Sequence, residues 1–119
     1  MSITCWPIVL YGVRCDKFKI KKEYCDEEGI GRNDVWDFLC SFYDLFRGFG
    51  LVFYCGGRKE IYIVIPPRYA WSDPNSDKYK TKSDADKVIV DFMFKYFEIG
   101  MSKKFFIRQI RSIETCGYE

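Results

Sequence analysis

The chain has 119 residues, a length that predicts one domain (1–119) with room for a hydrophobic core. Apolar residues make up 48% and aromatic residues 19%, a composition that excludes a disordered chain. The net charge of +2 is too small to predict nucleic-acid binding by itself. Eleven Phe, nine Tyr and three Trp exceed what a core of this size needs, so we expect some aromatic side chains to face solvent or a partner.

The chain has no histidine, so the commonest general base and metal ligand is absent. Six cysteines stand at positions 5, 15, 25, 40, 55 and 116 without a C-x-x-C pair, so a zinc site would need distant segments to converge. The N-terminus lacks the basic and apolar regions of a signal peptide, which predicts reduced thiols and a cytoplasmic protein. A disulfide-stapled domain is the alternative. We expect no metal and no cofactor. No apolar run approaches about 18 residues, so we expect no membrane span.

The N-terminal quarter predicts two strands and a loop. Residues Ile3–Val13 are rich in β-branched and aromatic side chains, which favours a strand buried on both faces. Because proline cannot donate to a ladder, either this strand starts at Ile8 or Pro7 lies at an edge or bulge. Residues Arg14–Tyr24 alternate apolar and lysine side chains, which is typical of a short edge strand. Residues Cys25–Arg32 are expected to form a loop.

Two later segments have the apolar spacing of amphipathic helices. The first is Asp34–Arg47, with Asn33 or Asp34 as its N-cap and glycines directly after it. The second is Asp84–Glu98, and we expect Ser83 to be its N-cap. Each helix would bury one apolar stripe against a sheet.

A hairpin lies between the two predicted helices. Its strands are Leu51–Cys55 and Glu60–Ile65, joined through Gly56-Gly57, where positive φ angles cost glycine little. Pro66-Pro67 end the second strand because proline has no N–H group to give to a ladder.

The remaining segments predict a long loop and a last strand. Residues Arg68–Lys82 are mostly polar, and a loop of about fifteen residues is either functional or mobile. Residues Lys103–Glu114 alternate apolar and polar side chains, which predicts a final strand. The last five residues are expected to fray.

The resulting element order is β(β)αββαβ, an α+β fold. Without the lysine-rich strand, this order is that of the split βαβ, or ferredoxin-like, plan. In that plan the sheet is antiparallel, the first strand lies between the second hairpin strand and the last strand, and both helices pack on one face. The other face would then be bare.

Two surfaces are candidate partner sites. The bare sheet face is too apolar to be simply solvated, and a contiguous apolar and aromatic patch marks a partner site. The long loop carries residue types that are enriched in interface hot spots. The alternative is that the extra strand or the loop folds over the face and that Trp71 fills one end of the core. The candidate residues are Arg68, Tyr69, Trp71 and Tyr79 in the loop, and Tyr54, Tyr62, Phe106 and Arg108 on the sheet face.

The charged clusters are less specific. Asp34, Asp37 and Ser41 lie off the apolar stripe of the first helix, as does Trp36, and we interpret the carboxylates as a solvated helix face. Lysines and arginines, whose positive charge can neutralise phosphate, form two groups at 17–22 and 103–111. Acidic residues follow the first group at once, and strand alternation explains its lysines without a ligand. The glycines match neither GxGxxG nor GxxxxGK[ST].

The chain resembles, in composition and size only, the small accessory proteins of bacteriophages, which often bind and block a host protein. That resemblance implies a host-cell cytoplasmic location and carries over no site. We therefore expect a non-enzymatic protein-binding module that inhibits a host factor. In one version of this expectation, two copies of the chain form a homodimer. A nucleic-acid-binding domain that uses Tyr54, Tyr62, Phe106 and Arg108 is the alternative, although the aromatic signature of the RNA-recognition module is missing. A small enzyme is the third and least favoured class, because no acid–base pair can be named.

Overall fold

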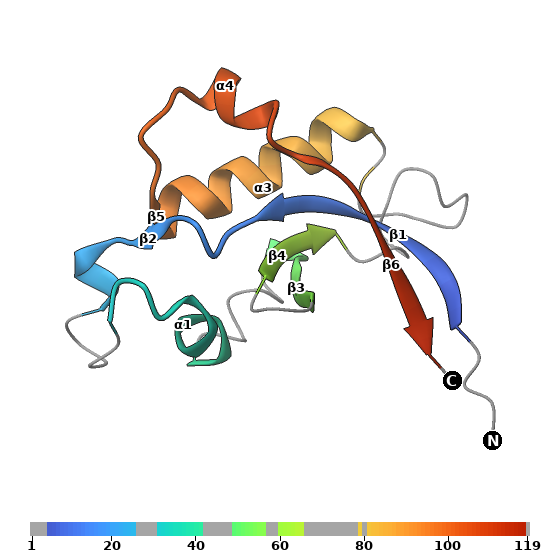
Figure 1. Ribbon diagram of the computed structural model, residues 1–119. Coiled ribbons are helices and arrows are strands. Elements are labelled where there is room, and N and C mark those ends of the chain that lie inside the picture. Colours follow the sequence, from blue (N-terminus) through green and yellow to red (C-terminus); the bar gives the residue numbers. More distant parts are fainter. Residues whose placement is uncertain are drawn as a thin grey trace.

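A four-stranded antiparallel sheet lies at the centre of this α+β structure (Figure 1). The computed structural model describes residues 5–25, 31–41, 49–56, 60–65, 79 and 81–118. Within that part of the chain the sheet contains β1 (Cys5–Arg14), β3 (Val52–Gly56), β4 (Glu60–Ile65) and β6 (Arg111–Tyr118). The strands lie in the order β3-β4-β1-β6.

Strand β1 has a neighbour on each side for part of its length. Its residues Tyr11–Arg14 pair with β4, and its residues Cys5–Gly12 pair with β6. The expected strand is therefore confirmed. Pro7 lies in the half of β1 that pairs only with β6, which is where a residue without an N–H group is tolerated. Figure 1 shows the start of β1 beside the end of β6.

The expected hairpin is confirmed as the β3–β4 pair. Val52 lies opposite Val64 and Tyr54 lies opposite Tyr62, so these four side chains share one face of the sheet. The hairpin turn at 57–59 and the prolines at 66–67 lie outside the described residues.

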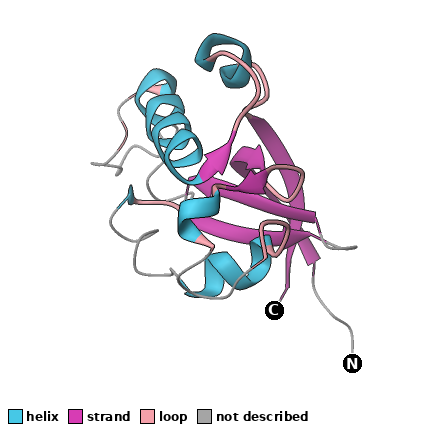
Figure 2. Ribbon diagram, turned by 90° about the vertical axis from the view of Figure 1, so that its left-hand side faces the viewer, coloured by secondary structure: helices cyan, strands magenta, loops and turns pink. Residues whose placement is uncertain are grey.

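The helices α1 (Val35–Ser41) and α3 (Lys82–Tyr96) both pack on the other face (Figure 2). Their buried side chains recur at helical spacing and join one core cluster with inward-facing residues of β1 and β4. The first helix is confirmed as far as Ser41, and residues 42–48 lie outside the described residues. The inward-facing strand residues are Tyr11, Val13, Ile61, Ile63 and Ile65.

The start of α3 differs from the expectation. Thr81, rather than Ser83, is the N-cap, and its side chain accepts a hydrogen bond from Asp84 N at 3.2 Å. The backbone of Thr81 is extended, as a cap requires, whereas Ser83 already lies inside the helix.

The expected strand over 103–114 is wrong in its first half. Residues Lys103–Ile107 form the short helix α4, capped by Ser102, whose side chain accepts from Phe105 N at 3.2 Å. The cap and the burial of Phe106 against α3 outweigh the alternating pattern. Strand β6 starts only at Arg111 and runs to Tyr118, so the expected fraying of the last five residues is also wrong as far as Tyr118. The ten-residue β1 supplies a partner for each of those residues.

The lysine-rich segment does not extend the central sheet. Its strand β2 (Lys19–Ile20) pairs with β5 (Phe97–Glu98), which directly follows α3, and these form a separate two-stranded sheet. A short 3-10 helix, η1 (Lys22–Tyr24), follows β2. Ile20 is completely buried in the core on the helical side of the sheet, so the segment packs over that core and is not an edge strand of the central sheet.

Candidate functional site

The loop residues that we expected to bind a partner are placed only in part. Arg68, Tyr69 and Trp71 lie outside the described residues. Tyr79 is 3% exposed, and its hydroxyl lies 2.9 Å from the carbonyl oxygen of Phe49. The expectation that Tyr79 is accessible on the loop surface is therefore wrong, because its side chain is buried in the core.

Phe106 is also misplaced by the sequence-based expectation. It is completely buried on the helical side of the sheet, with its ring centroid 5.8 Å from that of Phe18 and 5.5 Å from that of Phe94. Arg108 follows α4 and is exposed. Neither residue belongs to the bare sheet face, because the segment that carries them is helical instead of extended.

Tyr54 and Tyr62 do lie on the sheet face away from the helices, with ring centroids 6.5 Å apart. Tyr62 is 8% exposed, and its hydroxyl donates to Glu60 Oε2 at 2.9 Å. Burial, and then this hydrogen bond, raise the pKa of Tyr62. Together with Leu10 and Val64, Tyr62 forms a second small cluster of buried side chains, so this part of the face that we expected to be bare is buried.

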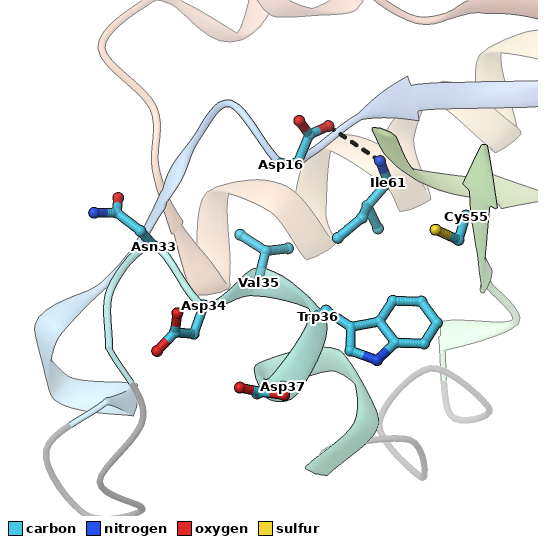
Figure 3. Close-up of a pocket in the computed structure, with 8 residues that line it drawn as sticks. All are labelled: Asp16, Asn33, Asp34, Val35, Trp36, Asp37, Cys55 and Ile61. Atoms are coloured by element: carbon cyan, nitrogen blue, oxygen red, sulfur yellow. Dashed lines mark hydrogen bonds between the residues drawn. The ribbon is translucent and has the colours of Figure 1, made fainter. Parts of the chain in front are cut away.

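A pocket opens on the helical side, at the start of α1. Its volume is about 500 Å³, and we call it the acidic pocket because the charged side chains that line it, among the described residues, are carboxylates. Figure 3 shows Trp36 extending toward Cys55 of β3, with Asp34 and Asp37 on the other flank of α1 and Asp16 above. The lining residues are Asp16, Asn33, Asp34, Val35, Trp36, Asp37, Cys55 and Ile61.

The three carboxylates of the acidic pocket differ in their partners. Asp16 is held by Arg14, whose Nε lies 2.8 Å away, and it accepts from Ile61 N at 3.1 Å. Burial works to raise the pKa of Asp16, but these hydrogen bonds outweigh it and hold the pKa below its usual value. Asp34 accepts from Gly31 N at 3.2 Å. Asp37 has no hydrogen bond or ion pair in the part of the chain that the structure describes.

Trp36 is the residue of this pocket that sequence reasoning underrated. It is 45% exposed, and its ring meets that of Phe53 edge-on, with centroids 5.3 Å apart. The available signal was its position off the apolar stripe of an otherwise amphipathic helix. A large aromatic side chain there has no core to fill and is free to contact a ligand.

The acidic pocket is poorly equipped for proton transfer or nucleophilic attack. The thiol of Cys55 has no histidine to activate it, since the chain contains none. The lowered pKa of Asp16 makes that carboxyl a poor proton donor near neutral pH. Among the described residues, no three Cys, Asp or Glu side chains gather closely enough to hold a metal ion. What the pocket offers is an aromatic wall and negative charge.

A second hollow, of about 330 Å³, brings together the two basic groups seen in the sequence. We call it the basic cleft. It is formed by the end of β1, the turn after it, the turn after α4, and the first residue of β6. Sequence reasoning missed it because its members stand more than 90 residues apart. The lining residues are Val13, Arg14, Lys17, Phe18, Arg108, Gln109 and Arg111.

Comparison with known proteins adds no assignment. Scans of the chain against protein-family models, curated proteins and solved structures each gave no match. Of the helices that the structure describes, none is long and apolar enough to cross a membrane.

Proposed function

We propose that the chain is a non-enzymatic protein-binding module whose acidic pocket accepts a lysine or arginine side chain of its partner. The observation that carries this proposal is the half-exposed Trp36 on the wall of a pocket whose charged lining residues, in the described part of the chain, are acidic. Tryptophan is the residue type most enriched in interface hot spots.

The chemistry of the lining favours a cation as the bound group. An ammonium or guanidinium group is attracted to the face of an indole ring, most strongly where water is excluded. Asp37 supplies a carboxylate that no described residue neutralises, and Asp34 adds a second. A guanidinium group would additionally match a carboxylate with two parallel hydrogen bonds, so arginine is the better fit.

The test uses a short capped peptide with one central arginine, and the same peptide with citrulline, which keeps the shape but lacks the charge. Titration is followed by ¹H–¹⁵N NMR, with the indole N–H of Trp36 as the reporter. We expect saturable shifts at Trp36 and Val35 with arginine only. Asp37→Asn should weaken binding at least threefold, whereas Asp91→Asn, an exposed carboxylate on α3, should not change it. Equal shifts with citrulline, or none with either peptide, would refute the proposal.

The wider interpretation, an accessory protein that blocks a host factor and forms a homodimer, rests on composition and size. Light scattering coupled to size-exclusion chromatography tests the dimer directly. A mass near 14.2 kDa at every concentration would remove it.

We also infer the ferredoxin-like plan for the fold. The sheet order β3-β4-β1-β6 supports it, as do the positions of α1 between β1 and β3 and of α3 between β4 and β6. The β2–β5 pair and α4 are additions to that plan.

A further inference from the structure

The basic cleft concentrates positive charge that the described part of the chain does not neutralise. Of the described residues that line it, four are cationic and none is acidic. Arg14 is ion-paired with Asp16 and lies 3.5 Å from Glu60 Oε1. Lys17, Arg108 and Arg111 form no ion pair within the described residues. Like charges repel one another at short range, so such a grouping is stabilised by a bound anion.

The residues of the cleft also continue onto the sheet face that carries the two tyrosines. Arg14 lies directly opposite Tyr62 in the register of β1 and β4, and Tyr62 lies opposite Tyr54 in the register of β4 and β3. The next row across the sheet is Arg111, Gly12, Val64 and Val52. Arginine and aromatic side chains thus follow one another across neighbouring strands on the same face.

The type of anion follows from the size and the donors of the cleft. A volume of about 330 Å³ suits one phosphate group and its ester carbons, and is far too small for a duplex. Arginine forks donate two parallel hydrogen bonds to phosphate or carboxylate oxygens. Tyr54, a half-buried aromatic side chain on the same face as Arg14, favours a ligand that has planar groups next to its phosphates, which is the composition of single-stranded nucleic acid.

We propose that the basic cleft binds a phosphate of single-stranded nucleic acid, with Lys17, Arg108 and Arg111 as its donors. The strand continues past Arg14 toward Tyr54, which is half-buried on the same face, while Tyr62 between them is buried. This site is separate from the acidic pocket and goes beyond the protein-binding function proposed above.

Salt dependence gives the proposal a quantitative form. Neutralising the one phosphate held in the cleft predicts a slope of about −0.7 for the logarithm of the binding constant against the logarithm of salt concentration. Raising the salt from 50 to 200 mM should then weaken binding roughly threefold.

The test measures anisotropy of a fluorescein-labelled twelve-nucleotide oligo(dT) against the full chain. The cleft variant is Lys17→Gln, Arg108→Gln and Arg111→Gln together. The matched control is Lys22→Gln, Lys87→Gln and Lys104→Gln, which removes the same charge from exposed residues elsewhere. We expect the cleft variant to bind at least tenfold more weakly and the control to stay within threefold of the wild type. Arg108→Gln alone should weaken binding about threefold and serves if the triple variant fails to fold.

Competitors separate the sources of the anion. Unlabelled oligo(dT) should displace the probe at micromolar concentration, and inorganic phosphate only at millimolar concentration. Displacement by poly-glutamate as effective as that by oligo(dT) would overturn the proposal in favour of an acidic protein partner. An equal loss of binding in the cleft and control variants would overturn it in favour of non-specific attraction, as would failure to bind oligo(dT) at 50 mM salt.

Discussion

Arg14 and Asp16 form an ion pair that connects the two candidate sites. Arg14 Nε lies 2.8 Å from Asp16 Oδ1, and Arg14 lines the basic cleft while Asp16 lines the acidic pocket. The pair therefore separates a surface suited to anions from one suited to cations at the same end of the sheet. Asp16 also accepts from Ile61 N, which ties the turn after β1 to the start of β4.

Asp16→Ala should destabilise the fold, because Ile61 N loses its acceptor and Arg14 loses its partner. We expect a loss of about 1–3 kcal/mol in the free energy of unfolding. The pKa of Asp16 is lowered in the folded state, so its contribution is present above the ordinary value of 3.8 and is lost as the pH falls through the folded value. Urea unfolding at pH 6 and pH 2 measures this. If the free energy of unfolding of the wild type exceeded that of Asp16→Ala by the same amount at both pH values, the lowered pKa of Asp16 would be contradicted.

The hydroxyl of Tyr11 in β1 donates to Asp86 Oδ1 in α3, and both side chains are buried. Tyr11→Phe leaves this carboxylate without that donor, so we expect a loss of about 1–3 kcal/mol. Burial, followed by the hydrogen bond, raises the pKa of Tyr11. Its contribution is therefore complete below the ordinary value of 10.0 and declines as the pH rises above it.

Unfolding measured at pH 8 and at pH 11 tests the Tyr11 prediction. The advantage of the wild type over Tyr11→Phe should shrink at pH 11, because only the wild type loses stability when the unfolded tyrosine ionises. If the difference in the free energy of unfolding between the wild type and Tyr11→Phe grew with pH, the predicted direction of the pH dependence would be wrong.

The thiols of Cys15 and Cys40 should differ sharply in reactivity. Cys15 is completely buried, its Sγ donates to Ile61 O at 3.4 Å, and burial raises the pKa of its thiol. Cys40 is exposed on α1. We expect a maleimide to label Cys40 within minutes and Cys15 only after unfolding, as read by mass spectrometry of the digested protein. Labelling of Cys15 at a comparable rate in the native protein would show that its segment opens readily.

Gly12 of β1 allows a close approach to β4. A Cβ atom at this position would lie 2.0 Å from Ile63 O and 2.7 Å from Val64 Cα. Gly12→Ala therefore forces the two backbones apart, and we expect a loss of at least about 2 kcal/mol in thermal or urea unfolding. Gly100→Ala is the control, because nothing lies within 4 Å of its Cβ position. Equal stability of the two variants would argue against this register.

The cap of α3 gives a test of the revised helix start. Thr81→Ala removes the oxygen that accepts from Asp84 N and should cost about 1 kcal/mol. Ser83 is the second residue of the helix, and Ser83→Ala should change the free energy of unfolding by less than half as much. The reverse ranking would restore Ser83 as the cap.

The elements with a strong local pattern were predictable from the sequence alone. The apolar run of β1, the two strands around Gly56 and the apolar spacing of α3 each identified an element within a few residues of its bounds. Such patterns work because burial on one or both faces of an element imposes a period on neighbouring residues, and that period is written locally.

Tertiary contacts decided the rest. The segment 103–107 alternates like a strand, but packing of Phe106 against Phe94 in the preceding helix, and the Ser102 cap, make it helical. Tyr79 has the composition of a binding residue, yet the carbonyl oxygens of a segment 30 residues away hold it inside. Local sequence does not contain these partners.

Both candidate sites follow the same division. The sequence by itself determined the ingredients: an aromatic residue off the stripe of a helix, carboxylates beside it, two basic groups, and no histidine. Only the tertiary structure decided that Asp16 and Cys55 line the same pocket as Trp36, and that Lys17 lines the same cleft as Arg108 and Arg111. The physical reason is that β1 ends beside both β4 and the start of β6, so pairing between strands that are far apart in the sequence brings these side chains together.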